Sequence, residues 1–496
     1  MVNLGVNANS YIRNKHFKEI LNGEKMSQEK VSRRNYLKIG AGVAVAAVAI
    51  GAGGYYAYET TRPKVKPKIR YLGYPFYLPQ EAADKWKEER GQEIELTYED
   101  FWVLSQKQLA NPKVWDVAGS GRYRPLVDED LFLSFPMSKI PRWVPEKAVP
   151  LFTSPEKYFS PEQAERFTRL TWKSKEEVNK TMIAVPLMWN FDTGTYLPEF
   201  LPYGPPKGYE ADFEFNEYFN PEWKGKVGMY DEAFAVFTET GNWLDATGQM
   251  KITGALSSMD PEEIDKIFDY LLPIAKTGQF RTFWSKYADV VNLLSTRELW
   301  MSQSWNPIVF DTRKAGTPAF YSNYEHGGSF WYNSHYISKY ANPDVIEDAY
   351  ALMNWCLELY MQMTYTKQGY PTPMWGHDDV KNAMGDEFYG WFYQGKRTYL
   401  PIDEATKETW GKDHPEFAEL DERLQQGLFV PDVYFRHFWT GEAPRSGSPN
   451  PKGNIREMGS VEDRSKRCRF FSSPDLPDKN DYYLSKFEQL KAALPV

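Results

Sequence analysis

Apolar and polar residues alternate in short runs near the start of the main body of the chain. The stretches Ile69–Tyr74 and Glu93–Tyr98 have the two-residue period of strands, and Val114–Ala118 is a third short apolar run. Between the first two, residues 80–90 have the spacing of an amphipathic helix that ends at Gly91. A strand, helix, strand order with short helices predicts a parallel sheet with crossover helices, and therefore an α/β fold.

Similar patterns recur along the rest of the chain. Strands are predicted at residues 183–189 and 298–301, the first ending in an aromatic residue. Helices are predicted where Asp-Pro or Asn-Pro pairs supply caps or where apolar residues return at helical spacing. These helices are 260–277, 342–359 and 482–493.

Residues 302–336 hold two clusters of aromatic and amide side chains. The first is Trp305-Asn306, and the second is the run 330–333, Phe-Trp-Tyr-Asn. Between them the run 315–318, Ala-Gly-Thr-Pro, predicts a turn, because Gly permits unusual φ values and Pro fixes its own φ. Two clusters joined by a chain reversal predict two walls of one pocket. No acid, base or nucleophile stands out among them, which favours a protein that holds a ligand over an enzyme.

Composition indicates a soluble globular protein with an excess of aromatic residues. Charged residues make up 25% and hydrophobic residues 42% of 496 positions, enough for two or three compact units. Aromatic residues reach 16%, a surplus that suits sites for sugars, amines or stacked bases. The formal net charge is -8, of which residues 1–57 carry +5 and the remainder -13. An acidic body disfavours nucleic acid as a partner and suits a cationic ligand.

The N-terminal region predicts export. The run 32–38, Ser-Arg-Arg-Asn-Tyr-Leu-Lys, precedes the weakly apolar residues 39–57 and resembles a twin-arginine translocation signal. The alternative is a retained membrane tether, since residues 39–57 are just long enough to span a bilayer. We expect a leader with signal or anchor at 1–57, a basic Pro-punctuated linker at 58–68, and a periplasmic, cell-surface or extracellular location. Whether the signal is cleaved, and whether Met1 or Met26 is the start, stays open.

The pattern across residues 302–336 resembles a known family. The order W-N, A-G-T-P and G-G-x-F-W-x-D/N-S is similar to a segment of the spermidine/putrescine-binding proteins, the substrate-binding subunits of polyamine ABC importers. Residues 183–189 resemble the segment in which that family crosses between its lobes. Residues 222–227 and 369–373 are similar to its P-E-Y/F-K-G-K-V/I and G-Y-P-T-P motifs. From Trp375 to about residue 480 the resemblance lapses.

The resemblance implies a two-lobed periplasmic-binding-protein-like fold of type II, with the ligand cleft between the lobes. Lobe 1 is expected to contain residues 69–187 and 306–352, and lobe 2 residues 188–305 and 353–496. Residues 375–480 would form an elaboration of the second lobe, with a role that the sequence does not indicate.

Candidate ligand-binding residues come from loops at the carboxyl ends of predicted strands and from positions that match the family's motifs. Tyr74 and Tyr77 match the family's Trp and Tyr in N-W-x-x-Y-V-P, and Tyr123 matches the last position of Y-D-L/V-x-x-P-S-x-Y. Ser120 matches the serine of that motif with a shift of one residue. The full set is Tyr74, Tyr77, Ser120, Tyr123, Asp231, Glu232, Trp284, Trp305, Asn306, Trp331 and Asn333. For each aromatic residue, core packing is the alternative.

The resemblance also implies where the ligand's ammonium groups would be held. Asp231 and Glu232 follow a predicted strand whose counterpart in relatives ends in acids. Their alternative role is an acid pair that complements the dipole of the next helix. A further family acid is replaced by Ala235, and Asn333 stands where relatives often carry Asp. The site is therefore expected to be polyamine-like but less acidic than a typical spermidine site.

The function expected from the sequence is capture of a putrescine- or spermidine-like amine by a monomer that passes it to an ABC permease and its ATPase, without a cofactor or bound metal. The same fold could instead bind a sugar, a cationic amino-acid-like compound or a metal complex. A secreted sugar-active enzyme is a further alternative, because aromatic clefts with paired acids also serve glycosidases. The run 377–379, His-Asp-Asp, is one loop that could bind a metal. Cys356 and Cys468 form either one disulfide or two buried thiols.

Overall fold

A computed structural model of the chain describes residues 66–99, 101–121, 123–197, 200, 214–253, 255–256, 259–317, 319–322, 324–396, 459–471 and 480–495. Residues 1–65 are a separate unit from residues 66–496. The predicted signal or anchor at 39–57 and most of the predicted linker therefore lie outside the described residues. In the described part, no helix combines the length and the apolar character needed to cross a membrane.

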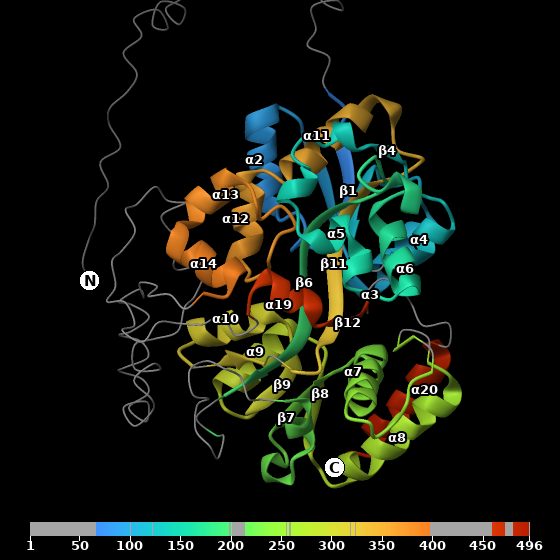
Figure 1. Cartoon of the computed structure of the whole chain (residues 1–496), viewed down its shortest axis with the longest axis vertical. Coiled ribbons are helices and arrows are strands. Elements are labelled where there is room, and N and C mark those ends of the chain that lie inside the picture. Colours follow the sequence, from blue (N-terminus) through green and yellow to red (C-terminus); the bar gives the residue numbers. More distant parts are fainter. Residues whose placement is uncertain are drawn as a thin grey trace, which may run out of the picture. The chain divides into compact units, whose positions relative to one another are not determined.

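One ten-stranded mixed sheet runs through residues 66–496 (Figure 1). Its main path is β2 (Ile94–Tyr98), β1 (Ile69–Gly73), β3 (Val117–Ser120), β11 (Gly328–Ile337), β6 (Val185–Tyr196), β9 (Met301–Ser304), β7 (Val227–Tyr230) and β8 (Phe280–Trp284). The strands β1, β2 and β3 are parallel to one another, and so are β7, β8 and β9. The sheet thus contains two parallel parts, as the alternation of strands and helices predicts for its first part.

Two long antiparallel strands join these parts. β6 pairs with β11 through residues 185–192 and with β9 through residues 193–196, while β11 also pairs with β3. The predicted strand 183–189 is too short, because β6 continues to Tyr196. Two edge pairings complete the sheet, β10 (Phe320–Tyr321) on β6 and β12 (Cys468–Phe471) on β11.

Helices cover both parts of the sheet. Those around the first part are α2 (Gln80–Arg90), α3 (Phe101–Ala110), α4 (Arg124–Asp128), α5 (Pro150–Thr153), α6 (Pro161–Thr171), α11 (Ile346–Trp355), α12 (Leu359–Lys367), α13 (Asp378–Met384), α14 (Asp386–Gln394) and α19 (Val461–Lys466). Those around the second part are α7 (Ala233–Ala246), α8 (Pro261–Lys276), α9 (Tyr287–Ser295), α10 (Asn306–Lys314) and α20 (Asn480–Ala492). In Figure 1, α9 and α10 lie on one side of β7–β9, and α7, α8 and α20 lie on the other.

The buried residues form separate cores that correspond to the two lobes. The first core takes side chains from 69–189, 330–393, 461 and 468. Two further clusters take theirs from 191–324 and 483–490. The first cluster includes buried residues from 353–393, and the other two include buried residues from 308–324. The lobe boundaries predicted from the sequence stay a prediction. Buried apolar residues of α10, which begins at Asn306, pack in the third cluster, and those of β11 pack in the first.

The C-terminal elaboration reaches the crossing strands. Residues 459–471 form α19 and β12, and β12 pairs in parallel with the first residues of β11. Gly327, at φ 75°, is required there because a β-carbon would clash with the backbone oxygen of Arg467. Cys356 and Cys468 are both buried and free, which confirms the alternative of two buried thiols.

Candidate functional site

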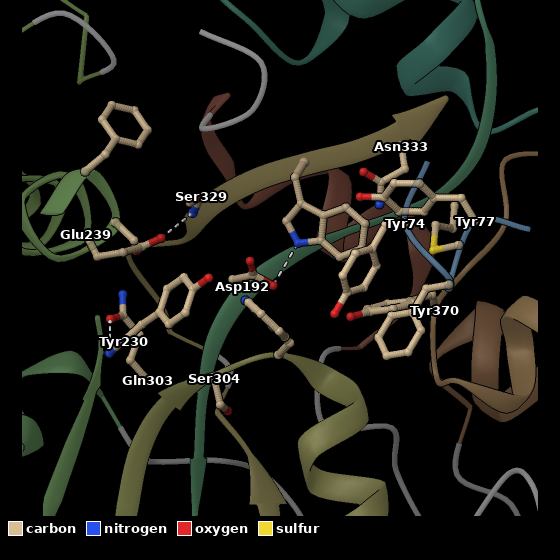
Figure 2. Close-up of a pocket in the computed structure, with 16 residues that line it drawn as sticks. Tyr74, Tyr77, Asp192, Tyr230, Glu239, Gln303, Ser304, Ser329, Asn333 and Tyr370 are labelled. Atoms are coloured by element: carbon tan, nitrogen blue, oxygen red, sulfur yellow. Dashed lines mark hydrogen bonds between the residues drawn. The ribbon is translucent and has the colours of Figure 1, made fainter. Parts of the chain in front are cut away.

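A cavity lies beside the crossing strands, with an open volume of about 950 Å3 that includes its connection to solvent (Figure 2). Its lining comes from both lobes: the loop after β1, both crossing strands, the ends of β7 and β9, helix α7 and the segment before α13. The lining residues are Tyr74, Phe76, Tyr77, Met188, Asp192, Tyr230, Phe234, Ala235, Glu239, Gln303, Ser304, Trp305, Ser329, Trp331, Asn333 and Tyr370.

The alternation of a β-strand decides which side chains of β11 face the cavity. Ser329, Trp331 and Asn333 lie on its cavity side, whereas Phe330 and Tyr332 are fully buried in the first core. Both aromatic and amide clusters of residues 302–336 thus contribute to one cavity.

Asp192 projects from β6 into the cavity. The indole Nε1 of Trp331 donates a hydrogen bond to its Oδ1 over 2.7 Å. Burial raises the pKa of Asp192 to about 7, and the hydrogen bond from Trp331 only partly offsets this shift. Sequence analysis missed this residue because the predicted strand stopped before it. The polar residues around Asp192 gave no local signal of a continuing strand.

Glu239 is the second carboxylate, and it lies on α7 with 4% of its surface exposed. The backbone N–H of Ser329 donates to its Oε1 over 3.3 Å, and its Oε2 has no hydrogen-bond partner among the described residues. Burial raises its pKa well above the usual range, and the nearby charge of Asp192 raises it further. Ser329 is the register partner of Asp192, so the two acids flank one residue of β11.

Glu239 lies close to Ala235, which stands where the resemblance implies a further acid. Ala235 does line the cavity, and Glu239 lies one helical turn further along α7, on the same face. The longer side chain of Glu239 reaches the cavity from there. The signal in the sequence was an acid at helical spacing after Ala235, in a helix whose first turn is apolar.

Aromatic rings form much of the remaining wall. The ring of Tyr74 lies 5.3 Å from that of Phe76 and 5.9 Å from that of Tyr77, between centroids. The rings of Trp331 and Tyr370 meet edge to face at 4.9 Å. The lining residues in the described part of the chain include no Lys, Arg or His. The cavity therefore combines two carboxylates with aromatic faces and contains no cationic side chain of these types.

Comparison with known proteins identifies the family. Residues 81–382 match the model for bacterial extracellular solute-binding proteins. The chain belongs to this family. A search of curated protein sequences gave no match.

Several solved structures are similar to this solute-binding protein. A putative spermidine/putrescine ABC transporter protein from Listeria monocytogenes is 16% identical, with 71% of this chain and 92% of that chain covered and a TM-score of 0.45. The spermidine/putrescine substrate-binding protein PotD from Streptococcus pneumoniae is also 16% identical, with 71% and 98% covered and a TM-score of 0.46. The fructose-6-phosphate-bound AfuA from Actinobacillus pleuropneumoniae is 13% identical, with 62% and 85% covered and a TM-score of 0.42. Likeness of this degree does not select a ligand.

Five of the predicted site residues of the solute-binding protein line the cavity: Tyr74, Tyr77, Trp305, Trp331 and Asn333. Ser120 and Tyr123 lie outside its lining and are fully buried in the first lobe. The hydroxyl oxygen of Tyr123 lies within hydrogen-bond distance, 3.0 Å, of both Ser334 Oγ and the backbone oxygen of Leu170. These contacts correspond to the packing role that was the alternative for Tyr123.

Trp284 and Asn306 also lie outside the lining. Trp284 packs behind Trp305, with ring centroids 5.5 Å apart, and its Nε1 donates to Ser302 Oγ over 2.9 Å. Asn306 is buried as the first residue of α10. Trp284 thus supports the ring of Trp305 from behind.

Asp231 and Glu232 have partners within the fold. Lys491 Nζ of α20 forms an ion pair with Asp231 Oδ1 at 3.0 Å. Glu232 caps α7, since its side chain accepts a hydrogen bond from the backbone N–H of Ala235. This matches the alternative role at a helix N-terminus.

Proposed function

We propose that this solute-binding protein is the substrate-binding component of an ABC-type importer and captures a linear cationic amine of the polyamine class. The observation that carries the proposal is the pairing of Asp192 and Glu239 in a cavity whose lining, in the described part of the chain, includes no Lys, Arg or His. The ligand's partners after capture would be a membrane permease and its ATPase. We further propose an exported monomer, as the sequence predicts.

The chemistry of such a ligand fits each part of the cavity. An ammonium group placed near Ser329 would donate charge-assisted hydrogen bonds to both carboxylates. Its methylene groups would lie on the faces of Trp305, Trp331 and the tyrosines, where dispersion and cation–π attraction contribute about 0.5–2 kcal/mol per contact. Glu239 Oε2 has no partner among the described residues, so the ligand would satisfy it.

Other ligands are weaker candidates. No cluster of three or more metal-binding side chains occurs among the described residues. In the loop considered for a metal, His377 Nε2 contacts the backbone oxygen of Arg142, and Asp379 forms an ion pair with the Arg142 side chain. A neutral sugar would offer no counter-charge to Asp192 and Glu239, whereas an ammonium group would.

Calorimetric titration of the purified protein tests the proposal. Putrescine, spermidine, a neutral disaccharide and a divalent metal ion would be titrated separately at about 0.15 M salt, where surface attraction is largely screened. We expect saturable binding of an amine and no binding of the sugar or the metal ion. Binding of the sugar or the metal ion without binding of either amine would overturn the proposal. Turnover of a chromogenic glycoside would favour the enzyme alternative instead.

A further inference from the structure

The two ends of the cavity differ in charge. Asp192, Glu239 and Ser329 lie together at one end, and Asn333 lies at the other with Tyr74, Tyr77 and Tyr370 (Figure 2). Among the lining residues of the described chain, the far end therefore contains amide, hydroxyl and aromatic groups and no carboxylate.

Strand geometry gives the separation of these ends. Ser329 pairs with Asp192 and Asn333 pairs with Met188 across the same two strands. Four residues of extended strand correspond to roughly 13 Å. A four-carbon diamine is shorter than this span, whereas the same diamine with an acyl group on one nitrogen extends further along it.

Asn333 is the polar group at the far end, and it is available for a ligand. Its residue surface is 8% exposed, and its side chain makes no hydrogen bond with another described residue. The amide offers both a donor and an acceptor, which complement a second amide or a hydroxyl. A second ammonium group there would be desolvated without a counter-charge, which is costly.

We propose that the site selects a linear amine with one cationic end and one neutral hydrogen-bonding end, and specifically a mono-N-acylated diamine. This inference rests on the proposed function. The ammonium group lies between Asp192 and Glu239, and the acyl amide lies against Asn333 and the neighbouring tyrosines.

The charge of the acidic end agrees with a single ammonium group. Glu239 is buried and Asp192 is half-buried, and two full negative charges at the same end of such a cavity are unfavourable. The nearby charge of Asp192 does raise the pKa of Glu239. The pair is therefore expected to carry fewer than two negative charges, which agrees with one ammonium group at this end better than with two.

The test compares four ligands by calorimetry on the full chain: putrescine, N-acetylputrescine, butylamine and 4-aminobutyrate. We expect N-acetylputrescine to bind at least about tenfold more tightly than putrescine, because only putrescine places a second charge at the neutral end. Butylamine, without the polar end, and 4-aminobutyrate, with an anionic end, are expected to bind more weakly than N-acetylputrescine. Tighter binding of any of these three than of N-acetylputrescine would overturn the inference.

Variants test whether Asn333 determines the preference for N-acetylputrescine over putrescine. Asn333→Asp should move the preference towards putrescine by about tenfold or more, because it adds a counter-charge at the far end. Asn292→Asp makes the same charge change at an exposed position of α9 and should leave the preference unchanged. An unchanged preference in Asn333→Asp, in a variant that retains the wild-type circular dichroism spectrum, would overturn the role of Asn333.

The outcomes separate this inference from the proposed function. If putrescine or spermidine binds more tightly than N-acetylputrescine, the inference fails and the proposed function stands. If none of the amines binds, the proposed function itself fails.

Discussion

Two pairs of acids in this solute-binding protein differ in burial and in the partners that the fold gives them. Asp231 and Glu232 are adjacent in sequence and partly exposed, and each already has a partner, in Lys491 or in the first turn of α7. Asp192 and Glu239 come from different elements, β6 and α7, line the same cavity and include an oxygen without a partner among the described residues. An acid whose partner lies within the fold has little capacity left for a ligand. An acid that is buried and underpartnered keeps that capacity.

The second pair is costly for the empty protein. Burial raises the pKa of both Asp192 and Glu239, which means that their charged forms are destabilised there. Strongly perturbed acids in a cleft are typical of functional sites. Asp231 and Glu232, in contrast, have the roles of an ion pair and a helix cap, which stabilise the second lobe.

The largest expected effect comes from neutralising the cavity pair. Asp192→Asn and Glu239→Gln should each weaken amine binding by about tenfold to a hundredfold, since a hydrogen bond to a charged group contributes about 1.5–3 kcal/mol. Asp231→Asn should change the affinity by less than about twofold, because its partner is Lys491. Titration calorimetry measures the amine affinity of all three variants. An equal loss of affinity in Asp231→Asn and Asp192→Asn would contradict the distinction between the two pairs.

The next effect tests the aromatic wall. Trp305→Ala should weaken amine binding by about tenfold, because it removes a ring that lines the cavity. Trp300→Ala is the matched control, since Trp300 is also half-buried but stacks on Phe200 outside the cavity lining. Fluorescence or calorimetric titration measures both, with thermal unfolding to confirm that each variant is folded. Unchanged affinity in Trp305→Ala would exclude this ring from the site.

Sequence reasoning recovered the local elements better than the site. The helix at 80–90 has the predicted bounds, and α8 begins with the predicted cap at Asp260, completed by Glu263. Such features depend on neighbouring residues and are readable from short windows. Glu239 is a different case, because its role depends on which face of α7 meets the cavity.

The crossing strands show why the rest of the site was not predicted. The strand at 183–189 was predicted too short because residues 190–196 contain Asn, Asp, Thr and Gly, which are unusual in a buried strand. Those residues are buried or nearly so because β6 passes between two lobes with β11 and β9 as neighbours. Only long-range pairing places Asp192 opposite Ser329, and a single sequence does not contain that information.

A smaller effect is expected from pH. Because the pKa of Asp192 in the empty cavity is raised to about 7 by burial, the acid is largely protonated below that pH. An ammonium group favours the charged form, so binding releases a proton and the affinity falls by up to about tenfold per pH unit below 7. Calorimetry between pH 6 and pH 8.5, in two buffers with different ionisation enthalpies, measures the released proton. A flat profile in the wild type would contradict this, and Asp192→Asn should flatten it.

The smallest effect is on the stability of the ligand-free protein. The folded-state pKa of Asp192 is about 7, above the value of about 3.9 expected in the unfolded chain. Its contribution to stability is therefore complete below about pH 4 and is lost as the pH rises through about 7. Asp192→Asn avoids this loss and keeps an acceptor for the Trp331 indole, so we expect it to be more stable than the wild type at pH 8 by about 1–2 kcal/mol.

Urea unfolding of the ligand-free proteins at pH 5 and pH 8 measures that difference. Asp269→Asn, at an exposed position of α8, is the control and should shift stability little at either pH. The stability gain should be smaller at pH 5 than at pH 8, because the wild-type acid is protonated at pH 5 and costs less. If Asp192→Asn is less stable at both values, the carboxylate is a structural group, and the contrast between the two acid pairs disappears. If Asp192→Asn is more stable and also binds the amine more weakly, the Asp192 carboxylate destabilises the folded protein and contributes to ligand binding.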